Sequence, residues 1–133
     1  CIKFVKSKNI NFNYVYVINT SSPFVSNDDI SNSFNIIDFF KLDKVIGVIK
    51  QTNNYYFHNG KGLKQLNDNS YLRLERNEIY EEIGGITIFD KKNMFKNKHK
   101  IGHVLCDQMR SFQVKDENDF LYAKFIGRKL SRR

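Results

Sequence analysis

Proline and cysteine are scarce in this chain, and long apolar runs are absent. The 133 residues contain one proline, Pro23, and two cysteines, Cys1 and Cys106. Two cysteines cannot form the disulfide framework of a small secreted protein, which favours a reducing compartment. The uncharged apolar stretches are far shorter than the ~20 residues of a membrane-spanning helix, and no charged segment followed by an apolar one opens the chain. We therefore expect a soluble, cytoplasmic protein without membrane contact.

Length and charge limit the domain count and the classes of partner. The chain fits one modest domain, residues 1–133, and because it begins with Cys1 rather than methionine we expect a piece of a longer protein. A net charge of +8 suggests nucleic-acid binding through phosphate attraction. Lysines outnumber arginines 16 to 6, however, and they are scattered apart from one basic run at residues 128–133. We do not expect specific nucleic-acid binding.

The single proline closes an apolar run that ends in small polar residues. Residues 15–18 are apolar without alternation, which favours a strand buried on both faces in a parallel sheet flanked by helices. Ligands of such sheets bind at the carboxyl ends of the strands. The candidate binding residues are therefore Asn19, Thr20, Ser21 and Ser22. Taken alone, these residue types favour an ordinary loop over a binding site.

A helix and a second strand are predicted next. Ser26 and Asp29 have the spacing of a capping box with aspartate in place of glutamate, so a helix should begin here and extend to about Phe40. Apolar residues recur at helical spacing on one face of this segment. Residues 45–49 then predict a second buried strand. Strand, helix and strand in this order indicate a βαβ unit of an α/β fold.

The middle of the chain favours β structure with irregular connections. Residues 51–66 fit a hairpin or an extended arm, because the pair Asn59–Gly60 favours a tight turn in which both residues need positive φ. Residues 67–70 are predicted to form a loop. The pair Gly84–Gly85 precedes a strand at residues 86–89, and paired glycines allow another backbone or a ligand to approach closely. A simple turn or bulge would explain the pair equally well.

The last segment predicts another strand that leads into a helix. Residues 111–115 alternate like a short strand, which places Gln113 and Lys115 on the same side. Asp116 is the expected cap of the following helix, and Asp119 lies three residues on, near its positive end. The buried face of this helix is expected to consist of Phe120, Leu121 and Phe125.

His99, His103 and Cys106 superficially resemble half of a zinc site. Gly102 disfavours a helix that would present both histidines on one face, and structural zinc requires four ligands with a second pair nearby. We therefore predict no metal site among them. The order of residues also reveals no nucleophile arrangement of the Ser/His/Asp or Cys/His kind.

Three stretches of the chain follow one another in an order typical of one enzyme family. Residues 19–30 are similar to a strand end, a Thr-Ser-Pro loop and the helix after it. Residues 80–89 are similar to a tyrosine-containing turn before a strand that begins with glycine, and residues 110–120 to a terminal strand and helix. Together they resemble the C-terminal two-thirds of the sugar-acid cytidylyltransferases, the CMP-N-acetylneuraminate (CMP-sialic acid) synthetase family. The resemblance covers nearly the whole chain.

The resemblance implies a fold and a reaction. The fold would be a three-layer αβα nucleotidyltransferase domain (GT-A/Rossmann-like) with a mostly parallel sheet, here without its N-terminal βα unit, in a homodimer whose dimerisation arm is residues 51–80. The reaction would transfer CMP from CTP to a sialic-acid-like sugar with release of pyrophosphate, through attack of the anomeric hydroxyl on the α-phosphate, with Mg²⁺ as cofactor. The substrate-binding residues that the resemblance implies are Asn19, Ser21, Ser22, Tyr80 and Glu82.

Two departures from the family pattern bear on activity. The family's basic loop that cradles the triphosphate has no match, so we do not expect CTP turnover by these residues alone. The two aspartates that ligate magnesium in the family correspond to Gln113 and Lys115, an amide that binds metal weakly and a cation that repels it. These two are the catalytic candidates by position, yet the usual metal ligands are absent. Lys115 could itself supply positive charge, and Asp116 could reach inward after a one-residue slip.

Three hypotheses about function stay open. The chain is the larger part of a CMP-sugar synthetase, or a catalytically inactive relative that acts as a sugar-binding, nucleotide-binding or dimerisation module, or a basic binding protein of another kind. Gln113 and Lys115 favour the second hypothesis. The sequence does not identify the sugar acid or the nucleotide base.

Overall fold

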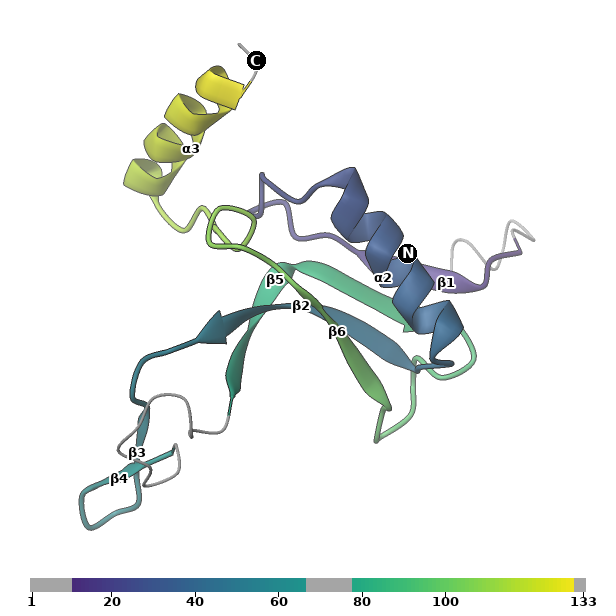
Figure 1. Ribbon diagram of the computed structural model, residues 1–133, viewed down its shortest axis with the longest axis horizontal. Helices are drawn as coiled ribbons and strands as arrows, with labels where there is room; N and C mark the ends of the chain where they lie inside the picture. Colours follow the sequence, from purple (N-terminus) through teal and green to yellow (C-terminus); the bar gives the residue numbers. More distant parts are fainter. Residues whose placement is uncertain (1–10, 67–77, 131–133) are drawn as a thin grey trace.

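A four-stranded sheet with one helix packed on it forms the body, and a hairpin arm and a second helix project from this body (Figure 1). The computed structural model describes residues 11–66 and 78–130. The loop predicted at residues 67–70 and the chain ends, with Cys1 and residues 131–133, lie outside the described residues. In chain order the elements are β1 (Tyr14–Val17), α2 (Asn27–Phe39), β2 (Lys44–Gln51), β3 (Tyr56–His58), β4 (Leu63–Gln65), β5 (Ile79–Asp90), β6 (Ile101–Leu105) and α3 (Glu117–Leu130).

The sheet has the strand order β1-β5-β2-β6. Strand β5 is antiparallel to both of its neighbours, and β2 is parallel to β6. β1, β2 and β6 therefore run in one direction, but β2–β6 is the one parallel pairing among the described strands. β5 runs the other way because the chain leaves β2 and enters β5 at the same end of the sheet, where Gln51 lies opposite Ile79. The mixed α/β class is as predicted, and the mostly parallel character is seen only in strand direction.

Strand β1 differs from the prediction of a strand buried on both faces. It forms an edge of the described sheet and pairs only with β5. Val17 is 48% exposed, and Ile18 after it is 53% exposed. The predicted βαβ unit is present as β1, α2 and β2, but β5 lies between its two strands. The apolar run predicted the strand correctly, whereas its neighbours depend on pairings that are distant in the sequence.

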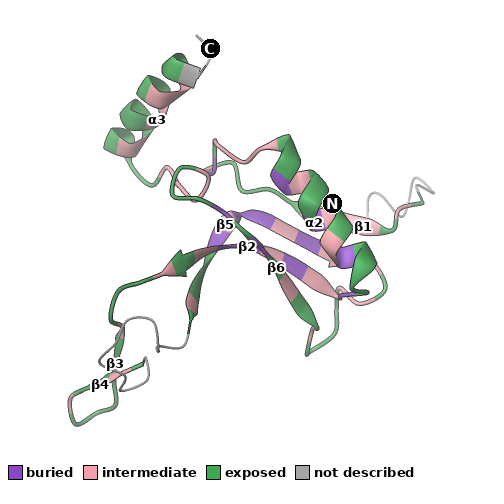
Figure 2. Ribbon diagram, in the orientation of Figure 1, coloured by how far each residue is buried: buried purple, intermediate pink, exposed green. Residues whose placement is uncertain are grey.

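The core lies between α2 and one face of the sheet (Figure 2). Val45, Ile86 and Ile88 are fully buried on the sheet side, and Ile37 of α2 is 1% exposed. In the described residues α2 is the only helix that contacts the sheet. The described body therefore has two layers, and the predicted three-layer arrangement is seen only in part.

Helix α2 begins at the predicted cap. The Ser26 hydroxyl accepts a hydrogen bond from the Asp29 N–H, and the Asp29 carboxylate accepts one from the Ser26 N–H, which completes the capping box. The aromatic rings of Tyr14 and Tyr16 in β1 contact Phe34 on the same helix. The capping pair thus fixes the helix start directly after the polar loop that follows β1.

The arm predicted at residues 51–66 is a hairpin of β3 and β4 that projects from the body (Figure 1). Its loop differs from the predicted tight turn. Gly60 has a φ of 86°, but Asn59 does not adopt positive φ, and the Asn59 N–H donates to the carbonyl of Gly62 across a longer loop. The side chain of His58 accepts the Gly60 N–H, which holds this wider turn.

Helix α3 starts as predicted but does not bury its apolar face. The Asp116 carboxylate accepts the Asp119 N–H at 2.9 Å, as a capping residue does. Phe120, Leu121 and Phe125 are 56–57% exposed, and no helix or strand of the described part contacts α3. The prediction of a buried face is therefore wrong for the described residues, because the chain leaves the body before the helix begins (Figure 1).

Within the described residues, no helix has both the length and the apolar content needed to cross a bilayer.

Cys106 follows β6 and is 4% exposed, so its thiol should be unreactive in the folded protein. Burial, with a smaller contribution from the Asp29 carboxylate, raises the pKa of this thiol to about 11. At pH 8 we expect a Cys1→Ser variant, which leaves Cys106 as the one thiol, to react with a thiol reagent at least ~100-fold more slowly when folded than in urea. Equal rates in both states would contradict the burial.

The raised pKa of Cys106 also makes the free energy of unfolding depend on pH. Burial of the neutral thiol favours the folded state below the thiol's ordinary pKa of 9.0, and this contribution is lost as the pH rises through about 11. Urea midpoints of the Cys1→Ser protein should therefore fall between pH 9 and 11 more than those of a Cys1→Ser/Cys106→Ala protein.

Candidate functional site

The polar loop after β1 is held by two hydrogen bonds of Asn19. Its carbonyl accepts the Ser22 N–H at 3.0 Å, and its side-chain oxygen accepts the Ser21 N–H at 3.1 Å. Ser22 is 7% exposed, and its buried hydroxyl has no hydrogen-bond partner among the described residues. The three predicted residues of this loop therefore lie together at the carboxyl end of β1, as the sequence suggested.

The pair Gly84–Gly85 lies in a bulge of β5, beside this loop. β2 pairs Gly47 with Ile83 and the preceding Ile46 with Thr87, so residues 84–86 of β5 have no partner in β2. A side chain on Gly85 would begin 2.6 Å from Val25 Cγ2 and 2.9 Å from Ser22 Cβ. Glycine is required here because the loop after β1 packs directly on the bulge. The close approach that paired glycines permit is thus made here by side chains of the protein itself, those of Val25 and Ser22.

The segment with Gln113 and Lys115 is not the predicted strand. The N–H groups of Ser111 and Phe112 donate to the carbonyls of Asp107 and Met109, so the first half of the segment is a turn. Beyond it the Val114 N–H donates to the Ser21 carbonyl at 2.8 Å. This single backbone bond keeps Gln113 and Lys115 side by side and joins their segment to the polar loop.

An ion pair that the sequence did not predict anchors this segment. The Arg110 guanidinium lies 2.5 Å from the Asp29 carboxylate, whose side chain is fully buried, and 3.1 Å from Asp107. Desolvation opposes the charge of Arg110, but the two carboxylates outweigh it and raise its pKa. The two partners are 81 positions apart, and the capping role of Asp29 already explained its carboxylate, so no local pattern indicated the pair.

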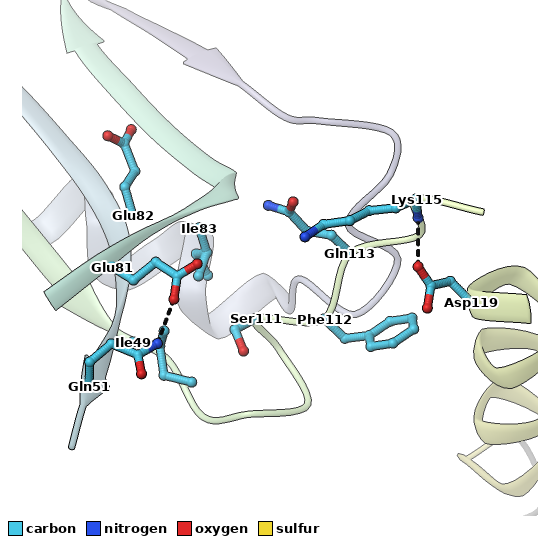
Figure 3. A pocket seen from close by; sticks show the side chains of 10 residues that line it. All are labelled: Ile49, Gln51, Glu81, Glu82, Ile83, Ser111, Phe112, Gln113, Lys115 and Asp119. Carbon is cyan, nitrogen blue, oxygen red and sulfur yellow. Dashed lines mark hydrogen bonds between the residues drawn. The ribbon is translucent and has the colours of Figure 1, made fainter. Parts of the chain in front are cut away.

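A cavity of about 430 Å³ lies between β5 and this segment (Figure 3). Its lining residues are Ile49, Gln51, Glu81, Glu82, Ile83, Ser111, Phe112, Gln113, Lys115 and Asp119. Three of the predicted residues, Glu82, Gln113 and Lys115, line it. Glu81, Gln51 and Asp119 were not predicted as site residues, and no local pattern distinguishes Glu81 from the adjacent Glu82.

The two walls of the cavity carry different groups. On the β5 wall Glu81 accepts a hydrogen bond from Gln51, and Glu82 lies 3.5 Å from the Lys44 ammonium. On the opposite wall the side chains of Gln113 and Lys115 extend side by side toward β5 (Figure 3). The Glu81 carboxylate therefore lies on one side of the cavity and the nitrogen donors of Gln113 and Lys115 on the other, whereas the side chain of Glu82 points away from them (Figure 3).

The predicted loop residues Asn19, Ser21 and Ser22 do not line the cavity, and neither does Tyr80. The Tyr80 hydroxyl donates to Glu78, which is also paired with Lys50, and its ring lies 5.2 Å from that of His103. The hydrogen bond to Glu78, together with desolvation, raises the pKa of Tyr80. Tyr80 is separated from Glu81 by one position on a strand, which directs it to the opposite face of the sheet.

The residues at this site do not fit a divalent metal. Magnesium is bound by carboxylate oxygens, whereas Gln113 offers a neutral amide and Lys115 a cation. Among the described residues no group of three or more histidine, cysteine, aspartate or glutamate side chains is placed to hold a metal ion. Asp116 does not reach inward, since it caps α3.

Comparison with known proteins supports the fold. No protein-family model matches the chain, and no curated protein matches it in sequence. A crystal structure of 4-diphosphocytidyl-2C-methyl-D-erythritol synthase from Anaerococcus prevotii is similar, with a TM-score of 0.66 and 14% sequence identity. The match covers 95% of this chain and 64% of that one, so the chain spans less than two-thirds of the neighbour's length. The chain has a cytidylyltransferase-type fold.

Removing the Arg110 guanidinium should destabilise the protein substantially. In an Arg110→Ala variant the Asp29 carboxylate stays buried with its Ser26 hydrogen bonds but without its cation, at a cost of about 3 kcal/mol. Urea unfolding measures the change. The control is Lys41→Ala, which removes a cation from an exposed pair with Asp38 and should leave the midpoint nearly unchanged. Equal midpoints for the two variants would contradict the anchoring role.

A methyl group at Gly85 should disrupt the packing of the loop on the bulge. Gly85→Ala forces Val25 and Ser22 to move, and we expect a loss of about 1–3 kcal/mol in the free energy of unfolding. Gly127→Ala is the matched control, because a side chain there meets nothing within 4 Å and alanine favours the helix by about 0.5–1 kcal/mol. Loss of stability in Gly127→Ala, or none in Gly85→Ala, would contradict this account.

Proposed function

We propose that this chain carries the sugar side of a cytidylyltransferase site that transfers CMP from CTP to a sialic-acid-like sugar and releases pyrophosphate. The observation that carries the proposal is the contact between three separate stretches. The loop at Asn19–Ser22 and the segment with Gln113 meet at the bulge of Gly84–Gly85, and Gln113 also lines the cavity. These are the stretches on which the resemblance to CMP-sialic acid synthetases rests, and the cytidylyltransferase-type fold supports it.

In the proposed reaction the anomeric hydroxyl of the sugar attacks the α-phosphorus of CTP. The new oxygen–phosphorus bond forms as the bond to the bridging oxygen breaks, and pyrophosphate leaves with the bonding electrons. Glu81, which makes no ion pair among the described residues, is the candidate acceptor of the hydroxyl proton. Glu82 accepts hydrogen bonds from other sugar hydroxyls. No step is assigned to a metal, because the donor set does not fit one.

The arm supports the proposed homodimer. Tyr56 is 54% exposed and Leu63 is 73% exposed on a hairpin that contacts no other strand or helix of the described residues. Exposed apolar side chains on a projecting hairpin are typical of a surface that a partner covers. We propose that the arm packs on a second copy of the chain and that the dimer is cytoplasmic.

Gln113 and Lys115 favour a second candidate function. Both occupy positions where the family resemblance expects magnesium-binding aspartates; the Gln113 amide is a weak neutral ligand, and the Lys115 ammonium repels the ion. A catalytically inactive relative that binds a sugar acid or a nucleotide would retain the cavity without the metal site. An inactive relative would bind the same ligands as the proposed enzyme but would not release pyrophosphate.

Measurements of ligand binding and of pyrophosphate release distinguish the enzyme from the inactive relative. We expect N-acetylneuraminate or CTP to shift NMR signals of the cavity residues in this chain, with no pyrophosphate release because the triphosphate loop has no match here. The complete product of the coding sequence should release pyrophosphate from CTP only when N-acetylneuraminate is present. Release without the sugar, or binding of neither ligand, would overturn the proposal, and binding without release from the complete product would support the inactive relative.

A further inference from the structure

We infer that three nitrogen donors, from Asn19, Gln113 and Lys115, form an oxyanion site that binds a phosphate or carboxylate group without a divalent metal. The inference rests on the proposed function only for the identity of the ligand, a phosphate of CTP or the carboxylate of the sugar. The donors come from two segments that the bond between the Val114 N–H and the Ser21 carbonyl holds together.

The amide of Asn19 is oriented by the loop itself. Its oxygen accepts the Ser21 N–H, so its NH₂ group must be the end that points toward the bulge. A side chain on Gly84 would begin 3.2 Å from this nitrogen. The NH₂ group has no hydrogen-bond partner among the described residues and remains available to an acceptor.

The amide of Gln113 reaches the same point from the other segment. Its nitrogen lies 2.9 Å from the position where a Gly84 side chain would begin. Two side-chain amides thus converge over a residue that has no side chain of its own. The glycine leaves room for them, which gives Gly84 a role distinct from the packing role of Gly85.

Lys115 adds a full positive charge beside these amides. Its backbone N–H donates to Asp119 at 3.0 Å, which fixes the backbone, while its side chain extends along Gln113 (Figure 3). The ammonium makes no ion pair among the described residues. A hydrogen bond from a charged donor to an anion is shorter and stronger than a neutral one.

The carboxylates of the cavity do not convert this site into a cation site. Glu82 is balanced by Lys44, Glu81 accepts a hydrogen bond from Gln51, and one oxygen of Asp119 accepts the Lys115 N–H. Two of them belong to the opposite wall. A metal ion near Gln113 would meet NH₂ and NH₃⁺ groups that repel it, whereas an oxyanion would meet three donors.

Titration with three probes, inorganic pyrophosphate, CTP and N-acetylneuraminate, in EDTA and in magnesium tests the inference by calorimetry and NMR. We expect at least one probe to bind in EDTA with a Kd within ~2-fold of its value in magnesium. Lys115→Ala should weaken that binding about 10- to 100-fold. Lys124→Ala, which removes the same charge from α3, should not. The Gly84→Ala variant should remain folded but bind more weakly, because a methyl group displaces both amides.

The outcomes separate this inference from the proposed function. Pyrophosphate binding in EDTA that depends on Lys115, without binding of CTP or sugar, would support the oxyanion site and overturn the proposed ligands. Binding of CTP or sugar only in magnesium would support the proposed ligands and overturn the oxyanion site. Binding of no probe under either condition, or equal loss in the Lys115→Ala and Lys124→Ala variants, would also overturn the site. A Gln113→Asp/Lys115→Asp variant should acquire metal-dependent binding, measurable with Mn²⁺ by water relaxation.

Discussion

The buried carboxylate of Asp29 is the interaction on which the arrangement of the site depends. It closes the capping box with Ser26, and so fixes where α2 begins after the polar loop. It also binds the Arg110 guanidinium at 2.5 Å, and so fixes the turn that precedes Gln113. One fully buried charge therefore determines the positions of two segments that are 81 residues apart. A buried charge tolerates little displacement from its partners, which gives the site a rigid base.

The bulge in β5 is the place where the loop after β1 and the segment with Gln113 meet. Without side chains at Gly84 and Gly85, Ser22 and Val25 pack against Gly85, and the amides of Asn19 and Gln113 both approach Gly84. The backbone bond between Val114 and Ser21 then closes the arrangement. These contacts act together. The bulge leaves room for the loop after β1, and the ion pair between Arg110 and Asp29 positions the segment that carries Gln113.

Local signals in the sequence predicted both helices and several strands, but they missed β6, predicted a strand at residues 111–115 that does not form, and did not reveal which elements are neighbours. The capping spacing of Ser26 and Asp29 predicted α2 correctly because both partners lie within one helical turn. The insertion of β5 between β1 and β2 depends on a long-range pairing, so the apolar run of β1 was mistaken for a fully covered strand. The exposed apolar face of α3 was likewise predicted as buried, because helical spacing reveals a face but not what covers it.

The residues of the candidate site were likewise predicted only in part from the sequence. Gln113, Lys115 and Glu82 were named as candidates by resemblance, and all three line one cavity, although the strand assumed for the first two does not form. Tyr80 does not line the cavity, and its hydroxyl is bound to Glu78 instead. The role of Asp29 could not be inferred, since its local capping function accounted fully for an acidic residue there.

The polarity of the two cavity walls restricts what can bind. A site organised by magnesium has carboxylates on the metal side, and the ion then attracts phosphate. Here acceptors lie on the β5 wall, at Glu81 and Glu82, and donors lie opposite, at Gln113 and Lys115 (Figure 3). A ligand with hydroxyl groups at one end and an acid group at the other satisfies both walls in a single orientation. A cationic group would be repelled by Lys115, whereas an anionic group beside Gln113 and Lys115 would be attracted. The arrangement of the walls therefore favours a ligand that brings an acidic group to Gln113 and Lys115 and hydrogen-bond donors to Glu81.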